Sequence, residues 1–360
     1  MNGTDPDLVL DENGVCNHCH NAQRELKIAE ESKPNLDKII KQIKKDGKGK
    51  KYDMIVGISG GVDSSTAIHH AVNLGLRVYA ITMDNGSNHS FADENILRIV
   101  ETLKVPLYRY VLDLEKFERV YAAYMKAGVI NLEAVYDHLL MASIYEVSSK
   151  YNVRWILSGG NVNSESVMPI SWSFPARDLV NIKDIYYKTM GRNLKGSKNF
   201  PLCGVWRWNF YKWIKRIRTF YLLDYLEYNR QKSEQMLIEK YGFKSTGAKH
   251  EENERTKWFQ SYWLFERYGI DKRLAHYSSL INSGQLSRES ALRMLQDFPV
   301  YPYLGIEKRV LKYPKHSHYD YKTDWIFPLV SDIIRNIRKI YHYVKRISKC
   351  FECHKKQIYI

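Results

Sequence analysis

The residues of this chain best suited to chemistry lie in the stretch Ser59-Gly60-Gly61-Val62-Asp63-Ser64-Ser65. Glycines let a backbone approach an anion closely and serine hydroxyls add donors, so the stretch predicts a phosphate cradle. Asp63 would repel phosphate, which makes it a candidate for binding Mg²⁺ or for ordering the loop. The stretch lacks both the lysine of the Gly-x-x-x-x-Gly-Lys loop and the Gly-x-Gly-x-x-Gly dinucleotide spacing, so it is neither of those phosphate sites.

The elements around this loop alternate between strand and helix patterns. Short apolar runs predict strands at residues 54–58, 77–82, 107–112 and 153–157, and helical patterns cover residues 64–74, 94–103, 114–126 and 132–150. Such alternation predicts an α/β fold with a doubly wound parallel sheet. The loop then joins the first strand to a helix whose N-terminal amides and positive dipole end point at a bound anion.

Two further motifs follow predicted strands. Met83-Asp84-Asn85-Gly86 comes after the second strand, and Ser158-Gly159-Gly160-Asn161 comes after the fourth. Open α/β sheets bind ligands at the carboxyl ends of their strands, so we expect both motifs beside the phosphate loop. For each, an ordinary turn without a ligand is the alternative.

Residues 59–64 resemble the pyrophosphate loop, or PP-loop, of the ATP pyrophosphatase superfamily, whose consensus is Ser-Gly-Gly-x-Asp-Ser. The resemblance implies that a substrate oxygen attacks the α-phosphorus of ATP, that pyrophosphate leaves, and that Mg²⁺ assists. It implies Ser59 and Asp63 as catalytic residues. It also implies a larger set of nucleotide-binding residues: Ser59, Gly60, Gly61, Val62, Asp63, Ser64, Ser65, Asp84, Asn85, Gly159, Gly160 and Asn161.

Composition sets outer bounds on the kind of protein. The chain has 360 residues, a net charge of +15 and a pI near 9.3. The charge favours polyanionic partners such as phosphorylated metabolites, nucleic acid or an anionic membrane, and a merely solvated basic surface is the alternative. No apolar run is long enough to span a membrane, and the polar N-terminus is unlike a secretory signal, so we expect a cytoplasmic location.

Segments elsewhere indicate what receives AMP. Residues 11–19, 257–271 and 279–292 resemble the N-acetyl sugar amidotransferase family of bacterial lipopolysaccharide O-antigen and surface-polysaccharide biosynthesis. The resemblance implies that ATP adenylates the oxygen of an acetamido group on a nucleotide-linked sugar. Ammonia then displaces AMP and leaves an acetamidino group.

Ammonia needs a source, and glutaminases use an activated cysteine. Cys203 lacks the Gly-x-Cys-x-Gly turn of one glutaminase type, and no cysteine begins the chain as the other type requires. We therefore expect a separate glutaminase subunit, as the resemblance also implies, and we expect Cys203 to be a small buried hydrophobe. Candidates for polar groups near the sugar, each with a surface or structural role as its alternative, are Glu133, Asp137, His138, Glu165, His250, Glu251 and Glu252.

Four of the five cysteines form two Cys-x-x-Cys pairs, Cys16/Cys19 and Cys350/Cys353. A structural zinc site needs four ligands, which two such pairs can supply. In the resembling family another Cys-x-x-Cys lies just upstream of the residues that begin this chain. On this resemblance we expect Met1 to be an internal methionine of a longer protein and the zinc ribbon to be truncated in this chain. The two pairs could instead form separate half-sites, or remain four reduced, unpaired thiols.

Five regions follow from these patterns. They are a cysteine-knuckle segment at 1–24, a helix and linker at 25–51, the ATP-binding domain at 52–212, a mainly helical substrate or partner region at 213–310, and a basic amphipathic tail at 311–360. In the tail, apolar residues recur at helical spacing, at Ile333, Ile337, Ile340, Val344 and Ile347. Such a helix packs on protein or contacts an anionic membrane peripherally.

Two rival functions remain open at this level. One is a PP-loop enzyme that modifies tRNA, of the thiolase or lysidine synthase type, because positive charge and dense aromatics suit RNA. Against it, thiolation usually needs cysteines near the loop, and none lies between Cys19 and Cys203. The other is a non-catalytic nucleotide-binding subunit, which the intact loop argues against. We therefore expect no nucleic-acid partner.

Overall fold

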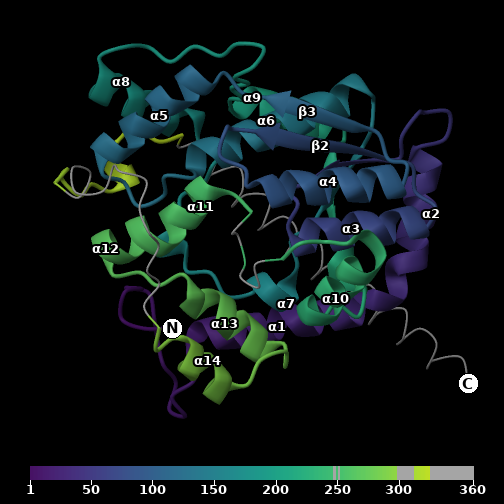
Figure 1. The fold of residues 1–360 in the computed structure, drawn as a ribbon. Helices are drawn as coiled ribbons and strands as arrows, with labels where there is room; N and C mark the ends of the chain where they lie inside the picture. Colours follow the sequence, from purple (N-terminus) through teal and green to yellow (C-terminus); the bar gives the residue numbers. More distant parts are fainter. Residues whose placement is uncertain (246–248, 250–251, 298–311, 325–360) are drawn as a thin grey trace, which may run out of the picture.

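The computed structural model describes residues 1–245, 249, 252–297 and 312–324. A five-stranded sheet lies at its centre, built from β1 (Met54–Gly57), β2 (Val78–Asp84), β3 (Leu107–Val111), β4 (Trp155–Ser158) and β5 (Arg218–Tyr221). The strand order is β3-β2-β1-β4-β5, and every pairing is parallel (Figure 1). The predicted parallel α/β fold is confirmed.

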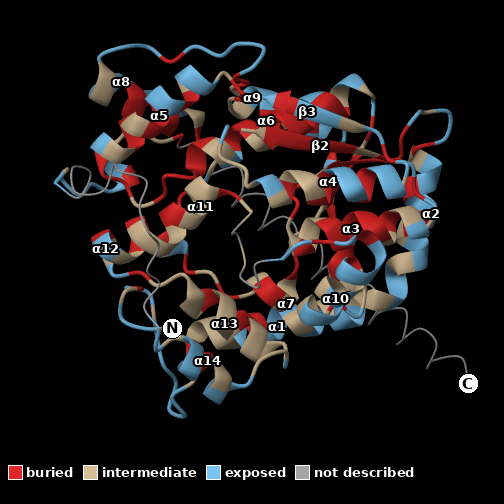
Figure 2. Cartoon of the chain, in the orientation of Figure 1, coloured by how far each residue is buried: buried red, intermediate tan, exposed pale blue. Residues whose placement is uncertain are grey.

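Helices cover both faces of the sheet, because successive side chains of a strand point to opposite faces. Met54 and Val56 pack into one buried cluster and Ile55 into another. The first cluster includes α2 (Leu36–Asp46), α3 (Val62–Asn73), α4 (Ser90–Thr102) and α10 (Arg230–Tyr241). The second includes α5 (Leu114–Ala127), α6 (Ala134–Lys150), α8 (Leu179–Met190) and α9 (Val205–Asn209). Figure 2 shows burial concentrated in the sheet and in the helix faces that pack on it.

The remaining helices follow or flank the sheet. They are α1 (Asn17–Ser32), α7 (Val162–Glu165), α11 (Glu254–Trp258), α12 (Leu264–Tyr268), α13 (Arg273–Asn282) and α14 (Arg288–Met294). Short helical turns lie at Lys33–Asn35, Ile170–Trp172, Phe210–Ile214, Leu222–Tyr225, Phe259–Trp263 and His318–Asp320. The mainly helical character expected after residue 213 holds for the described part of that region.

The fifth strand is a feature that sequence patterns did not predict. Arg218–Tyr221 lies at the sheet edge, pairs only with β4, and buries only Phe220. An edge strand with one buried side chain has no apolar run to reveal it. The sheet therefore extends into the region expected to be helical.

Two helix starts also bear on the predictions. Helix α1 begins at Asn17, inside the segment expected to be a cysteine knuckle, and Cys16 precedes its first turn. The predicted cap at Ser287 is confirmed, since its side chain accepts a hydrogen bond from Ser290 N. The predicted tail helix lies outside the described residues.

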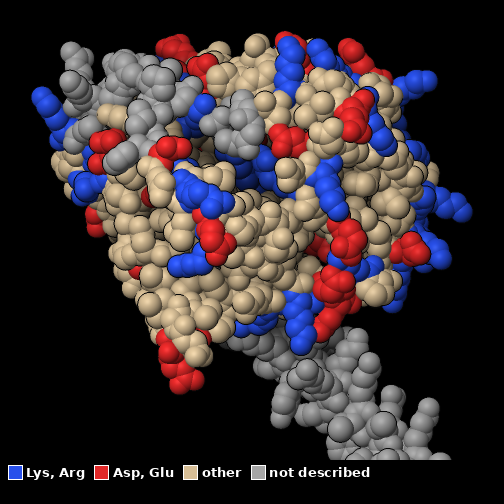
Figure 3. All heavy atoms as spheres, turned by 60° about the horizontal axis from the view of Figure 1, so that its bottom comes forward, with Lys and Arg blue, Asp and Glu red and all other residues tan. Residues whose placement is uncertain are grey.

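The surface of the described part carries basic side chains in many places. Figure 3 shows Lys and Arg side chains spread over one face and gathered around a hollow in it. In the described part of the chain, no helix has the length and apolar character that crossing a bilayer requires.

Candidate active site

The PP-loop lies at the carboxyl end of the central strand. β1 ends at Gly57, and α3 begins at Val62 after an extended Gly61. β1 pairs with β2 on one side and with β4 on the other, so the order of the strands reverses at β1. Open α/β sheets bind ligands at such a reversal, outside the carboxyl ends of the strands. The amides that begin α3 point into this crevice and suit an anion.

Two glycines are required by close approach. Gly60 has φ +81°, and a Cβ there would lie 2.4 Å from the carbonyl oxygen of Ala92 in α4. A Cβ at Gly159 would lie 2.7 Å from the backbone nitrogen of Ser64. The structure therefore brings the predicted Ser158–Asn161 turn against the first turn of α3, as expected.

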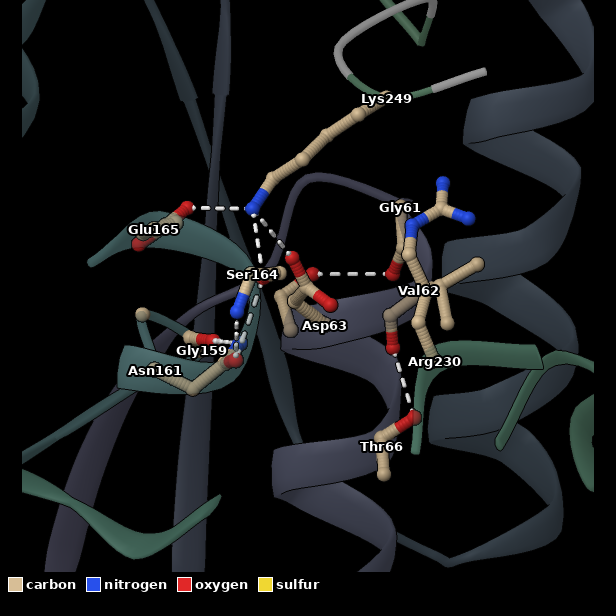
Figure 4. Close-up of polar contacts among 12 residues, drawn as sticks. Gly61, Val62, Asp63, Thr66, Gly159, Asn161, Ser164, Glu165, Arg230 and Lys249 are labelled. Carbon is tan, nitrogen blue, oxygen red and sulfur yellow. Dashed lines mark hydrogen bonds and ion pairs between the residues drawn. The ribbon is translucent and has the colours of Figure 1, made fainter. Parts of the chain in front are cut away.

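Asp63 is held by groups from distant parts of the chain. Tyr228 donates its hydroxyl hydrogen to the Asp63 carboxylate. Lys249 Nζ lies 3.0 Å from Asp63 Oδ2 and 2.7 Å from Glu165 Oε1. Figure 4 shows the Lys249 side chain reaching to a point between these two carboxylates. Burial lowers the pKa of Lys249, but both carboxylates raise it more, so the net shift is upward and Lys249 is cationic.

Glu252 lies over the PP-loop. Ser59 Oγ donates to its Oε1 across 3.3 Å, and a Cβ at Gly61 would meet the same oxygen at 2.6 Å. Burial raises the pKa of Glu252, and the charge of Asp63 adds to the rise. Two carboxylates beside a phosphate cradle fit Mg²⁺, which binds through one or two carboxylates plus substrate phosphates. Asp63 and Glu252 would hold this ion, and it would neutralise charge on the phosphates.

The PP-loop lines a cavity of about 620 Å³. Another part of its wall carries Glu133, Asp137 and Lys272. Burial raises the pKa of Glu133 to about 7, helped by the charge of Asp137, and burial raises the pKa of Asp137 to about 6. Burial lowers the pKa of Lys272 to about 8 against the pull of Asp137 and Glu165. These groups can exchange protons near neutral pH.

Most of the predicted nucleotide-binding residues line this cavity: Ser59, Gly60, Gly61, Val62, Asp63, Ser64, Gly159 and Gly160. Four others do not, namely Ser65, Asp84, Asn85 and Asn161. Ser65 is fully buried in α3.

The other three of these residues serve as local supports. Asp84 pairs with Arg109 across 3.4 Å. Asn85 accepts a hydrogen bond from Asn253 at 3.0 Å, and Asn161 caps α7 by accepting from Ser164 N. Thr82 and Met83, on the strand just before Asp84, line the cavity instead.

The residues proposed for the sugar also divide. Glu133, Asp137, Glu165 and Glu252 line the cavity, whereas His250 and Glu251 lie outside the described residues. His138 is a structural residue, because its buried ring contacts the Ala176 carbonyl and accepts from Cys203 N at 3.0 Å. Cys203 is buried as expected, and burial raises the pKa of its thiol to about 12, which keeps it unreactive.

Sequence reasoning missed Lys249, Lys272, Arg177, Tyr228 and Arg230. Tyr228 binds Asp63, and the other four line the cavity. None belongs to a local motif, and each comes from a segment far from the PP-loop in sequence. One local signal is present: Lys249 directly precedes His250, Glu251 and Glu252, which the sequence marks as candidate polar groups near the sugar.

The zinc prediction stays a prediction. The Sγ atoms of Cys16 and Cys19 lie 3.4 Å apart, so this pair is preformed. Cys350 and Cys353 lie outside the described residues. Within the described ranges, no group of three or more His, Cys, Asp or Glu side chains is arranged to hold a metal ion.

Two different protein families match two different parts of the chain. Residues 252–333 match the family model described as LPS biosynthesis protein WbpG-like, C-terminal domain, and residues 53–139 match that of queuosine biosynthesis protein QueC. No curated protein matches the sequence.

Similar solved structures include NH3-dependent NAD synthetase from Campylobacter jejuni subsp. jejuni and NMN synthetase from Francisella tularensis. The first is 18% identical over 38% of this chain, with a TM-score of 0.29, and the match spans 60% of the length of that protein. The second is 14% identical over 53% of this chain and 97% of the other, with a TM-score of 0.30. The matched family models and the PP-loop geometry together show that this chain joins a QueC-like PP-loop domain to a WbpG-like C-terminal domain.

Proposed function

We propose that this protein is an ATP-dependent amidotransferase of surface-polysaccharide biosynthesis. It converts an acetamido group of a nucleotide-linked sugar to an acetamidino group, with ammonia from a separate glutaminase subunit, and forms AMP and pyrophosphate. One observation carries the proposal: the same cavity is lined by the PP-loop and by the WbpG-like segment, through residues that include Thr256, Gln260 and Lys272. The segment similar to LPS biosynthesis proteins thus supplies a wall that faces the ATP site.

The first step is adenylation. The amide oxygen of the acetamido group attacks the α-phosphorus of ATP, and the bond to the β-phosphate oxygen breaks as pyrophosphate leaves. The PP-loop amides and the start of α3 stabilise the negative charge that develops on the phosphates. Lys249 and Arg230 add positive charge at the same place.

The second step is substitution. The nitrogen lone pair of ammonia attacks the carbon that bears the adenylated oxygen. The bond between this carbon and that oxygen then breaks, and AMP leaves with the electron pair. Two carboxylates that line the cavity, Glu133 and Asp137, can take up the proton that an ammonium ion must lose. Holding both reactants in one cavity supplies much of the rate enhancement.

The test is product analysis with the purified chain, ATP, ammonium and a panel of nucleotide-linked N-acetyl sugars. We expect AMP, pyrophosphate and a sugar product lighter by about one mass unit, since NH replaces oxygen in the displacement. Formation of ADP and phosphate would contradict the PP-loop assignment.

A matched pair of variants tests the site itself. Asp63→Asn should lower pyrophosphate formation by roughly 10²-fold or more, a loss usual for a removed charge-stabilising group. Asp37→Asn changes an exposed aspartate on α2 and should leave the rate unchanged. Circular dichroism melting checks that both variants are folded, and an active Asp63→Asn enzyme would remove Asp63 from its proposed role.

A further inference from the structure

The helical segment 205–214 carries a stripe of apolar side chains that are exposed in the part of the chain that the structure describes. Trp206 is 79% exposed, Ile214 70%, Trp213 54% and Phe210 43%. Their spacing places them on one side of the segment, which α9 and the turn after it form together. Single exposed apolar residues are ordinary, but a contiguous stripe of this kind marks an interaction surface.

The opposite side of the same segment is anchored in the protein. Trp208 and Tyr211 are buried and pack against Tyr145 of α6, with ring centroids 5.2 and 5.8 Å apart. The segment is therefore apolar on both sides, and one side already satisfies the core. Packing within the described chain gives no reason for the exposed side to carry two tryptophans and an isoleucine.

The surroundings of the stripe are positively charged. Between Asp184 and Asp224 the sequence has no Asp or Glu, and it has Lys188, Arg192, Lys195, Lys198, Arg207, Lys212, Lys215, Arg216 and Arg218. In Figure 1 the loop after α8 runs along the top edge of the view and leads to α9. Two of the cations contact the stripe itself, because Lys212 Nζ lies 5.3 Å from the ring centroid of Trp213 and Lys215 Nζ lies 5.9 Å from that of Phe210. Glu146 of α6 brings an acidic side chain to this surface, where it lies 3.8 Å from Arg207.

We infer that this surface, the stripe Trp206, Phe210, Trp213 and Ile214 with its flanking Lys and Arg residues, docks on an anionic lipid membrane. Tryptophan rings favour the interface between headgroups and acyl chains, and basic side chains bind anionic headgroups. Lys215 already lies 5.9 Å from the Phe210 ring centroid, so cation and apolar groups are presented together.

RNA is the competing polyanion, and the composition of the stripe decides against it. RNA binding uses aromatic rings on which bases stack, and an aliphatic side chain such as that of Ile214 offers no ring for stacking. Ile214 is among the most exposed apolar residues of the described chain. A bilayer interface accepts aliphatic and aromatic side chains alike.

The surface also lies close to the cavity. The Arg177 guanidinium stacks 5.3 Å from the ring centroid of Trp208, on the inner side of the segment, and Arg177 also lines the cavity. Docking would hold the enzyme where surface-polysaccharide precursors are used. The inference itself does not depend on the proposed function, because it concerns binding and not catalysis.

Vesicle sedimentation of the full chain tests the inference. We expect binding to vesicles of phosphatidylcholine with phosphatidylglycerol, no binding to phosphatidylcholine alone, and weakening by added salt. The triple variant W206A/W213A/I214S should bind anionic vesicles at least about tenfold more weakly, because it removes the inserted apolar surface. Tyr319→Ala is the control, since Tyr319 is 74% exposed outside the stripe.

Two results would overturn the inference. One is a wild-type chain that does not sediment with anionic vesicles but binds bulk tRNA. The other is a triple variant that binds vesicles as well as wild type, which would assign any binding to other residues. Because all three substituted side chains are exposed, thermal melting should be unchanged, and unaltered pyrophosphate formation would show that loss of binding is not loss of fold.

Discussion

Charged side chains alternate in sign along the cavity wall. Lys249 contacts both Asp63 and Glu165, and Lys272 responds to the charges of both Glu165 and Asp137. Such an arrangement keeps the buried charges compensated. The sequence motifs pointed to the acidic members of this series, Asp63, Glu165 and Asp137. They did not point to Lys249 and Lys272, because these lysines lie in segments without a local motif.

Glu133 breaks this pattern of compensation. Thr256 donates to its Oε2 at 2.8 Å, but within the described chain its buried Oε1 has no hydrogen-bond partner. Burial and the charge of Asp137 raise the pKa of Glu133 more than the Thr256 hydrogen bond and the charge of Arg255 lower it, so the charged form is only partly compensated. A group kept in that state at a cavity wall is a candidate for function and not for stability.

The Glu133→Gln variant should be more stable than wild type at neutral and alkaline pH. The folded-state pKa of Glu133, about 7, lies above its unfolded value of 4.5, so the folded chain binds the extra proton between these values. The carboxyl costs no stability below about pH 4.5 and costs progressively more as pH rises through 7, reaching about 3 kcal/mol. Urea unfolding at pH 5 and pH 8 measures this, and the two proteins should converge at the lower pH.

The control for this variant is Glu115→Gln on α5. The Glu115 side chain is 83% exposed, so its neutralisation should change stability little at either pH. A Glu133→Gln protein that is less stable than wild type at pH 8 would show that the carboxylate is compensated after all.

At the scale of elements, the sequence predicted most reliably the strands that are buried on both faces of the sheet. The residues of β1 read as an apolar run because both faces are covered, and the loop motif after it then located the start of α3. The edge strand β5 and the tight docking of α4 on the loop have no comparable signal. Their positions follow from long-range contacts, such as that of Gly60 with Ala92, which no local pattern records.

That contact predicts the effect of Gly60→Ala. The new Cβ would collide with the Ala92 carbonyl, and the positive φ would add strain of about 1–2 kcal/mol. The loop must then move away from α4, and a displacement near 1 Å in a positioned site costs about 10²-fold in rate. We expect pyrophosphate formation to fall by that order, measured at saturating ATP and at low ATP.

Gly191→Ala is matched to it in backbone conformation. Gly191 has φ +64° at the end of α8, but nothing lies within 4 Å of the new Cβ. It should lose stability by about 1 kcal/mol and keep its activity. Equal loss of activity in both variants would mean that backbone strain, and not the fit of the loop on α4, controls the rate.

At the scale of the whole molecule, the two matched segments are not separate bodies. Trp258, Trp263 and Leu264 of the WbpG-like segment belong to the same buried cluster as Ile55 and Ile81 of the sheet. Asn253 adds a polar link, since it bonds Asn85 beyond β2 and caps α11. Sequence patterns separated a nucleotide domain from a helical region, and they could not show this shared core because it joins residues far apart in the chain.

A shared core predicts one cooperative unfolding transition, and Trp263→Ala tests it. Trp263 is fully buried and lies within 6.0 Å of the Trp258 ring, so its removal leaves a cavity that should cost about 3–5 kcal/mol. Because the core is continuous, the sheet and helices α11 to α13 should unfold together, at one urea concentration, by far-UV circular dichroism and by tryptophan fluorescence. Trp206→Ala removes an exposed tryptophan and should leave the midpoint nearly unchanged. Two separated transitions in the Trp263→Ala protein would show instead that the helical segment unfolds by itself, and that the cavity wall it supplies is only loosely coupled to the PP-loop.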